Sequence, residues 1–164
     1  MTTKFLILAL FCFANQTSWD VTNIGNGLTI KFPNKAKTEV LFGVLSYESE
    51  NKNCQFFVDI DKLPVQLFPK NDMDVTIMLD RTVAYSKKRG VYISSKYFKL
   101  GKIKGIELTQ FFTPEKSVKL VERIMTFYHS NCRYDLRCLS KNLKQFPYTK
   151  DCETFFTSLK YKGK

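Results

Sequence analysis

The sequence predicts an α+β fold: a single domain with an antiparallel β-sheet of about six to seven strands, a long helix after the third strand and a C-terminal helix. The chain has 164 residues that are 44% hydrophobic and 15% aromatic, which is enough apolar material for the core of one domain. Apolar residues alternate with period two in several short segments, as in half-buried strands, and recur at helical spacing in two others. No internal repeat or linker is visible, so residues 27–164 are expected to form this domain.

The N-terminus has the layout of a secretory signal peptide. A short basic start ends at Lys4, an unbroken apolar run covers residues 5–14, and polar residues follow. We therefore predict that residues 1–14 are a signal peptide and that residues 15–26 form a flexible N-terminal segment. The alternative for the apolar run is a buried N-terminal strand or helix, but the order of basic, apolar and small residues favours export.

The predicted leader contains Cys12, which raises the alternative of a lipoprotein anchor. Lipid attachment normally requires a small residue just before the cysteine, and this chain has Phe11 there, so simple cleavage is favoured. Export would place the mature chain in an oxidising compartment, either secreted or periplasmic. No apolar run reaches the roughly 20 residues of a membrane-spanning helix, so no transmembrane segment is expected.

Four cysteines remain after the predicted cleavage, and an even number in an oxidising compartment indicates two disulfides. They are Cys54, Cys132, Cys138 and Cys152. Cys132 and Cys138 lie six residues apart in one predicted strand, about 20 Å at a rise of roughly 3.3 Å per residue, which is beyond bonding reach. The remaining choices are Cys54 with Cys132 and Cys138 with Cys152, or the crossed alternative. We favour the first, because polar turns precede both Cys54 and Cys132 and could place them at one end of a sheet.

Three strands are predicted before the long helix, at residues 27–32, 40–47 and 54–63. The first alternates and ends at Pro33, and the third has the period-2 pattern of a half-buried strand. The polar residues 48–53 join the second and third segments, so these two are expected to form a hairpin.

The long helix is predicted to begin where Asn71 or Asp72 can cap its first turn. Asp74 suits the positive end of the helix dipole, and apolar residues recur at three-to-four spacing over residues 75–83. A basic last turn followed by Gly90 is a typical helix end.

Strands are expected again at residues 91–100 and 106–112. Residues 114–129 are ambiguous, because a helix-start signal precedes apolar residues that fit either helical or strand spacing. We predict a strand, since a turn at residues 130–131 then leads into residues 133–139 and completes a hairpin. The chain is predicted to close with an amphipathic helix over residues 148–160, capped by a threonine or an aspartate.

Four segments together resemble the PsbP-like and DcrB-like (Mog/PsbP) fold group. They are the opening GLTIKFP, the central KGIELTQFF, the paired strands RIMTFYHSNCRYDLRCL and the closing DCETFFTSLK. The resemblance covers residues 27–160. Members of this group are mostly non-enzymatic accessory or binding proteins, including exported envelope proteins, so the resemblance implies an α+β fold and a non-catalytic role. The chain departs from the common pattern in carrying four cysteines.

The sequence contains little that indicates catalysis. His129 is the only histidine and lies in a predicted turn, where a solvated side chain is expected. No motif of the common hydrolases, nucleotide-binding proteins or metalloproteases is present, and no cofactor or metal site is expected. Asp59 and Asp61 share one face of a predicted strand, where two carboxylates could share a proton or hold a cation. The rival hypothesis is therefore a small envelope hydrolase or ligand-binding enzyme with a cleft near this pair.

Charge is distributed unevenly along the chain. The formal net charge is +11, and residues 81–106 contain eight basic and no acidic side chains, interleaved with aromatic residues. The basic residues are Arg81, Lys87, Lys88, Arg89, Lys96, Lys99, Lys102 and Lys104. If they gather in space, they form a basic patch for an anionic partner such as a membrane surface, a polysaccharide or an acidic protein. A diffuse solubilising charge is the alternative, and nucleic acid is disfavoured because export is predicted and lysine predominates over arginine.

The leading hypothesis from the sequence is therefore a secreted or periplasmic, non-catalytic binding or accessory protein. Its expected binding surface is the basic segment 81–106, and two disulfides are expected to stabilise its domain. The sequence does not specify the partner or the oligomeric state.

Overall fold

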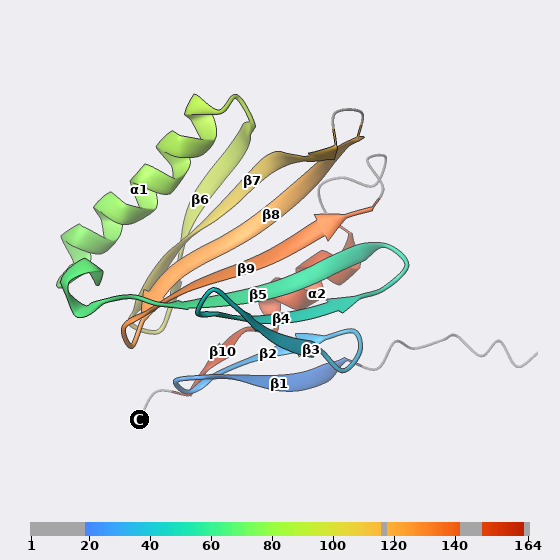
Figure 1. The fold of residues 1–164 in the computed structure, drawn as a ribbon, viewed down its shortest axis with the longest axis horizontal. Coiled ribbons are helices and arrows are strands. Elements are labelled where there is room, and N and C mark those ends of the chain that lie inside the picture. The colour runs from blue at the N-terminus through green and yellow to red at the C-terminus, as the bar shows by residue number, and fades with distance from the viewer. Residues whose placement is uncertain (1–18, 116–117, 142–148, 163–164) are drawn as a thin grey trace, which may run out of the picture.

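A computed structural model describes residues 19–115, 118–141 and 149–162 (Figure 1). The predicted signal peptide at 1–14, including Cys12, lies outside these residues. The elements in chain order are β1 (Asp20–Gly25), β2 (Leu28–Phe32), β3 (Lys37–Leu41), β4 (Val44–Glu50), β5 (Cys54–Lys62), the 3₁₀ helix η1 (Val65–Leu67), α1 (Asp72–Lys88), β6 (Tyr92–Leu100), β7 (Ile103–Glu115), β8 (Val118–His129), β9 (Cys132–Ser140), α2 (Lys150–Thr157) and β10 (Lys160–Tyr161).

The strands form two antiparallel sheets. The larger sheet has seven strands in the order β3-β4-β5-β9-β8-β7-β6, and the smaller has three in the order β1-β2-β10. The helix α1 packs against β6, β7 and β8 on one face of the large sheet, whereas α2 and the small sheet cover the other (Figure 1). The predicted α+β class is confirmed, but the single sheet expected from the sequence is two sheets.

The main core lies between the large sheet and the layer formed by the small sheet and α2. Fully buried aromatic side chains from both layers meet there, including Phe32 of β2, Phe56 of β5 and Phe155 of α2. Their ring centroids lie 5.1 to 5.5 Å apart, the range in which tilted aromatic pairs attract. A smaller cluster around Leu79 and Ile106 lies under α1 on the opposite face. The period-2 pattern of β5 thus buries one face of the strand, as its sequence predicts.

The region that the sequence left ambiguous is extended. The strand β8 spans Val118–His129 and pairs with β7 on one side and β9 on the other, which confirms the strand prediction. Ser130 and Asn131 join β8 to β9 with φ of 50° and 60°. A two-residue hairpin turn with both φ positive matches the twist of its flanking strands, so the turn fixes the register.

Three strands were missed. β10 begins at Lys160, inside the predicted helix 148–160, whereas α2 ends at Thr157, and β1 and β3 carry little of the alternation that identifies a strand. The expected flexible segment 15–26 is a wrong prediction where it includes β1, of which only Ile24 is buried. All five residues of β3 are exposed, because it is an edge strand of the large sheet. The segment 40–47, predicted as one strand, is divided between β3 and β4 by a turn at Phe42 and Gly43, whose φ values are 51° and 83°.

The predicted disulfide pairing is also corrected. The four cysteines of the described chain are free thiols. In the β5–β9 register Cys54 lies near Ser140, whereas Cys132 lies opposite Lys62, at the other end of both strands. The turns that precede β5 and β9 lie at opposite ends of the sheet because these neighbouring strands are antiparallel. Cys54 and Cys132 consequently cannot bond in this fold.

Candidate functional site

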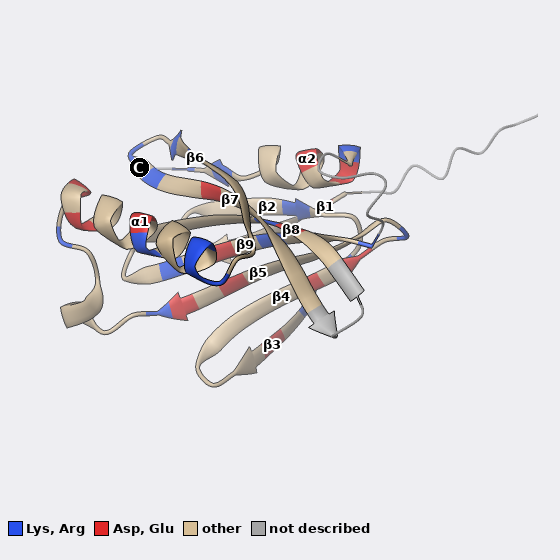
Figure 2. Cartoon of the chain, turned by 90° about the horizontal axis from the view of Figure 1, so that it is seen from above, with Lys and Arg blue, Asp and Glu red and all other residues tan. Residues whose placement is uncertain are grey.

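The eight predicted basic residues do not form one patch. The helix α1 and the strand β6 run in opposite directions, so the end of α1 lies far from the β6–β7 turn (Figure 1). The 17-residue helix is about 25 Å long at a rise of roughly 1.5 Å per residue. This length separates Lys87, Lys88 and Arg89 at the helix end from the three lysines at 99, 102 and 104. Figure 2 shows the basic positions distributed over several elements.

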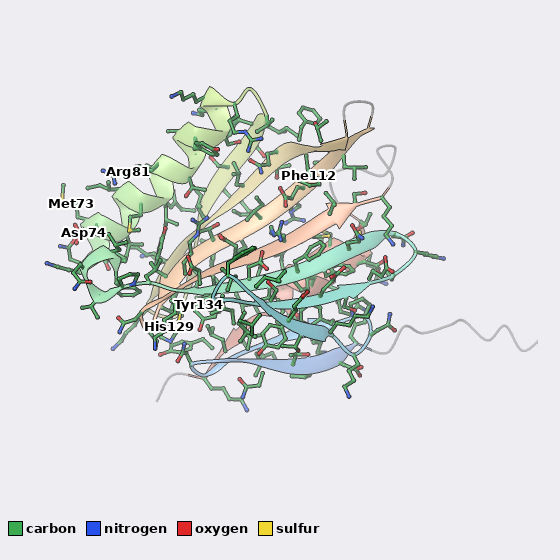
Figure 3. All side chains as sticks on the ribbon, in the orientation of Figure 1. Met73, Asp74, Arg81, Phe112, His129 and Tyr134 are labelled. Atoms are coloured by element: carbon green, nitrogen blue, oxygen red, sulfur yellow. The ribbon has the colours of Figure 1, made fainter. Side chains whose placement is uncertain are left out.

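Two further basic residues lie apart from both groups. Lys96 is on the opposite sheet face from α1, where its Nζ is 3.3 Å from an oxygen of Glu107. Arg81 projects from the side of α1 (Figure 3) and lines a cleft of about 370 Å³ that also includes Arg133. Neither residue adds charge to the groups at the two ends of α1.

Two of the three basic residues at the helix end lie over aromatic rings. The Lys87 ammonium lies 4.9 Å from the centroid of the Tyr92 ring, and the Arg89 guanidinium lies 5.6 Å from that of Tyr85. Both distances are within the range of cation–π attraction, which explains the interleaving of aromatic and basic residues in this part of the sequence. None of these basic side chains lines a described cleft.

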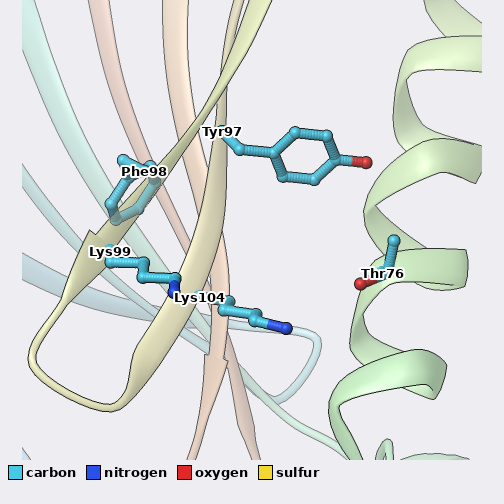
Figure 4. A pocket seen from close by; sticks show the side chains of 5 residues that line it. All are labelled: Thr76, Tyr97, Phe98, Lys99 and Lys104. Carbon is cyan, nitrogen blue, oxygen red and sulfur yellow. The ribbon is translucent and has the colours of Figure 1, made fainter.

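The lysines at the β6–β7 turn surround a recess at the start of α1. Lys99 and Lys104 line a cleft of about 400 Å³ between β6 and α1, and their side chains extend toward Thr76 of the helix (Figure 4). An adjoining cleft of about 360 Å³ is lined by Lys70, Lys102 and again Lys104. We call this double recess the lysine cleft and define it by Lys70, Lys99, Lys102 and Lys104.

The sheet register produces this concentration of charge. Lys99 and Lys104 are direct partners in the β6–β7 pairing and therefore point to the same face. Two like charges in this arrangement repel, and Asp72 offsets part of the repulsion with an oxygen 2.8 Å from the Lys104 Nζ. The hydrogen bond and charge of Lys104 lower the pKa of Asp72, so this carboxylate stays ionised. Among the described residues, Lys104 is the one member of the lysine cleft with an ion pair.

A tyrosine of β6 lines the cleft and contacts the helix. The Tyr97 hydroxyl donates a short hydrogen bond to Asp80 of α1, which raises the pKa of Tyr97. The bond holds β6 against the helix, and the Tyr97 ring supplies apolar surface beside the lysines. The Phe98 side chain points to the opposite sheet face, where its ring packs against Phe127. The lysine cleft therefore combines positive charge with one aromatic side chain, that of Tyr97. It can hold a carboxylate, phosphate or sulfate together with an apolar group.

The single histidine is less solvated than expected. The His129 Nε2 lies 3.1 Å from the Asn26 carbonyl oxygen, and its ring packs edge-on against Tyr161 at 5.0 Å. Figure 3 shows His129 at the end of β8, near the small sheet. These contacts connect the β8–β9 turn to the small sheet, and His129 also lines the outer part of the lysine cleft.

Of the aspartate pair of the rival hypothesis, Asp59 forms an ion pair with an arginine of the neighbouring strand. Asp59 accepts hydrogen bonds from Arg137 at 2.7 Å and from Ser46 at 2.6 Å. Asp61 lies opposite Arg133 in the β5–β9 register. Neither aspartate lines any of the four described clefts.

One buried charge was not foreseen from the sequence. Arg123 of β8 is 3% exposed, and its guanidinium lies 2.7 Å from Glu107 of β7 and 2.7 Å from Glu153 of α2. Arg123 also lies over the Phe156 ring, 4.9 Å from its centroid. The arginine thus joins α2 to the sheet. The available sequence signal is that Arg123 alternates with the apolar residues Val121 and Met125, which share its strand face.

The cleft also includes a residue outside the predicted basic segment. Lys70 precedes the basic segment 81–106 in the sequence and reaches the site because it lies just before the N-cap of α1. Within the described chain, no group of three or more histidine, cysteine, aspartate or glutamate side chains is arranged to hold a metal ion. Nor does the described part contain a helix long and apolar enough to cross a membrane.

Comparison with known proteins identifies the architecture. The chain matches the solution structure of cyanobacterial PsbP (CyanoP) from Synechocystis sp. PCC 6803 with a TM-score of 0.59, over 91% of this chain and 95% of that one. The fold is PsbP-like. The sequences are 13% identical, so the match shows the PsbP-like fold alone, and it confirms the resemblance drawn from the sequence at that level. No protein-family model and no curated protein sequence matches the chain.

Proposed function

We propose that this protein is an exported, non-catalytic accessory protein that holds an acidic segment of another protein in the lysine cleft. The observation that carries the proposal is the convergence of four lysines on one recess that contains a single ion-paired carboxylate. Four positive charges that converge on one recess attract an anionic group more strongly than the same charges dispersed over the surface. The PsbP-like fold is compatible with an accessory role.

The strand beside the cleft favours a protein partner over a lipid surface or a polysaccharide. β6 is the last strand in the order of the large sheet, so its outer edge can pair with an extended segment. Alternate side chains of such a segment point to one face, where carboxylates would meet Lys99 and Lys104. A lipid surface needs its lysines on a flat or convex area, whereas these lysines line clefts of about 400 and 360 Å³.

Two triple variants with the same net charge test this proposal. One replaces the lysines at 99, 102 and 104 with glutamine, and the matched control replaces Lys87, Lys88 and Arg89 with glutamine. Retention on immobilised poly-glutamate should weaken about tenfold in the first, which corresponds to roughly 1.4 kcal/mol, and little in the control. Equal weakening in both would indicate diffuse charge and contradict the proposal.

Heparin and vesicles of acidic lipid serve as comparison ligands for the same two variants. Cleft-dependent binding to either one, with none to poly-glutamate, would contradict the choice of an acidic protein segment. Thermal unfolding of each variant checks that the fold is kept. Export is tested separately by the mass of the mature chain, which should begin after Ala14.

A further inference from the structure

Three buried cysteine thiols meet beneath α2. Cys54 of β5, Cys138 of β9 and Cys152 of α2 are 0%, 2% and 4% exposed. The Cys138 thiol is within hydrogen-bonding range of both others, and no disulfide joins them. The fold thus brings together three of the four cysteines that the sequence assigned to two separate bridges.

The sheet register and the helix explain the meeting. Phe56 is opposite Cys138 in the β5–β9 pairing, so Cys54, two residues earlier, is a diagonal neighbour of Cys138 on the same inward face. Cys152 lies in the first turn of α2, and its side chain is buried against that face. Cys132 is at the far end of β9, where it lies opposite Lys62.

Two of the three thiols have pKa values that are shifted in opposite directions. The hydrogen bond from Cys138 lowers the pKa of Cys54 to about 7 against the opposing effect of burial, and Thr149, 3.2 Å from the Cys54 sulfur, adds to the lowering. Hydrogen bonds to Cys152 and Cys54, together with burial, raise the pKa of Cys138. Near neutral pH, Cys54 is therefore ionised in about half of the molecules, whereas Cys138 holds its proton.

We propose that Cys54, Cys138 and Cys152 form an oxidation site at which a small peroxide converts two thiols to one disulfide that always includes Cys138. Cys138 is the one sulfur that contacts both others, so it can bond to either but only to one at a time. The oxidant must be small, because the sulfurs are almost fully buried and a bulky disulfide reagent cannot reach them.

The chemistry balances with hydrogen peroxide as the oxidant. The Cys54 thiolate attacks one peroxide oxygen, the O–O bond breaks, and the departing hydroxide takes up a proton to leave as water. The Cys138 sulfur then attacks the Cys54 sulfenic acid, the S–O bond breaks, and the Cys138 proton leaves with the oxygen as a second water. Two thiols and one peroxide thus give one disulfide and two waters. Cys152 can then give up its proton and attack the Cys138 sulfur; the bond between Cys138 and Cys54 breaks, and the released Cys54 sulfur takes up a proton.

The position of the disulfide has a structural consequence. A bond between Cys54 and Cys138 stays within the large sheet, because both residues belong to neighbouring strands. A bond between Cys138 and Cys152 attaches α2 covalently to the sheet. Exchange between these two bonds would therefore determine whether α2 is tethered.

Tryptic mapping tests the proposal on the intact full-length chain. Cleavage after lysine and arginine places Cys54, Cys132, Cys138 and Cys152 in four separate peptides, 53–62, 124–133, 138–141 and 151–160. The reduced protein is treated with equimolar hydrogen peroxide in the presence of a chelator, alkylated under denaturing conditions and digested. We expect the loss of two hydrogen atoms per chain and a cross-link from peptide 138–141 to 53–62 or to 151–160.

Three results would overturn the proposal: no cross-link, a cross-link that includes peptide 124–133, or one that joins 53–62 to 151–160. Cys138→Ser should abolish the loss of two hydrogens, and the matched control Cys132→Ser should leave it unchanged. Because the wild-type map alone decides which sulfurs bond, the test remains decisive if Cys138→Ser does not fold. The oxidation proposal does not rest on the proposed function, so the peptide map tests it independently of poly-glutamate binding to the lysine cleft.

Discussion

Replacing Arg123 with methionine should destabilise the protein strongly. Arg123 forms ion pairs of 2.7 Å with two glutamates from different elements and is 3% exposed, so its removal leaves carboxylate charge behind in a region with little water. Breaking a buried ion pair by removing one partner typically costs about 3–5 kcal/mol. The side chain of Glu107 is only 10% exposed and bears most of this penalty.

Two features place the cost at the lower end of that range. The Lys96 Nζ, 3.3 Å from Glu107, still compensates part of its charge. The side chain of Glu153 is 43% exposed and can return to water. We therefore expect a loss of about 3 kcal/mol in the free energy of unfolding. Because the substitution is nearly volume-conserving, little of this loss comes from a cavity.

Urea denaturation followed by far-UV circular dichroism measures this loss. For a slope of about 2 kcal/mol per molar, the midpoint should fall by roughly 1.5 M without a change in slope. The control Lys141→Met removes an exposed ion pair to Glu50 and should leave the midpoint nearly unchanged. Adding Glu107→Gln to Arg123→Met should recover part of the loss, because it removes the buried unpaired charge. A midpoint shift for Arg123→Met no larger than that of the control would refute the reasoning.

Three further predictions concern single sites. The thiolate absorbance near 240 nm should increase as the pH rises, with a midpoint near pH 7, because the hydrogen bond from Cys138 lowers the pKa of Cys54. This step should be absent in Cys54→Ser, and a first midpoint near pH 9 in the unmodified protein would contradict the prediction. Gly105→Ala should cost about 1–3 kcal/mol in chemical denaturation, since its Cβ would lie 2.3 Å from the Phe98 ring; an unchanged midpoint would be inconsistent with that packing. Asn71→Ala should cost about 1 kcal/mol by the same assay, because the Asn71 side chain accepts two backbone N–H bonds at the start of α1; no loss would mean the cap contributes nothing.

The strands that bury one face could be predicted from the sequence, and those that bury little could not. Alternation identified β5 and β9, whose inward residues are almost fully buried. The strand β1 was not predicted because Ile24 is its single buried residue, and β3 was not predicted because none of its residues is buried. Whether the strands form one sheet or two depends on long-range pairing, such as that of β10 with β2, which no local pattern encodes.

The errors in the candidate site have a related origin. Residues 81–106 are continuous in sequence, but the chain reverses between α1 and β6, so their charges separate to opposite ends of the helix. The same reversal brings Lys70 beside Lys104, across 34 positions of sequence. The predicted cysteine pairing was wrong because the similar polar turns before β5 and β9 precede neighbouring antiparallel strands. These turns therefore lie at opposite ends of the sheet.

The most direct test of acidic-segment binding is an amide chemical-shift map of the labelled protein titrated with a short poly-glutamate peptide at about 0.15 M salt, where dispersed surface charges are largely screened. If the acidic segment binds in the lysine cleft, the largest shifts should occur at residues 99–104 and 70–76, with little change at 87–89. Shifts of similar size at both ends of α1, or none near the β6–β7 turn, would contradict it.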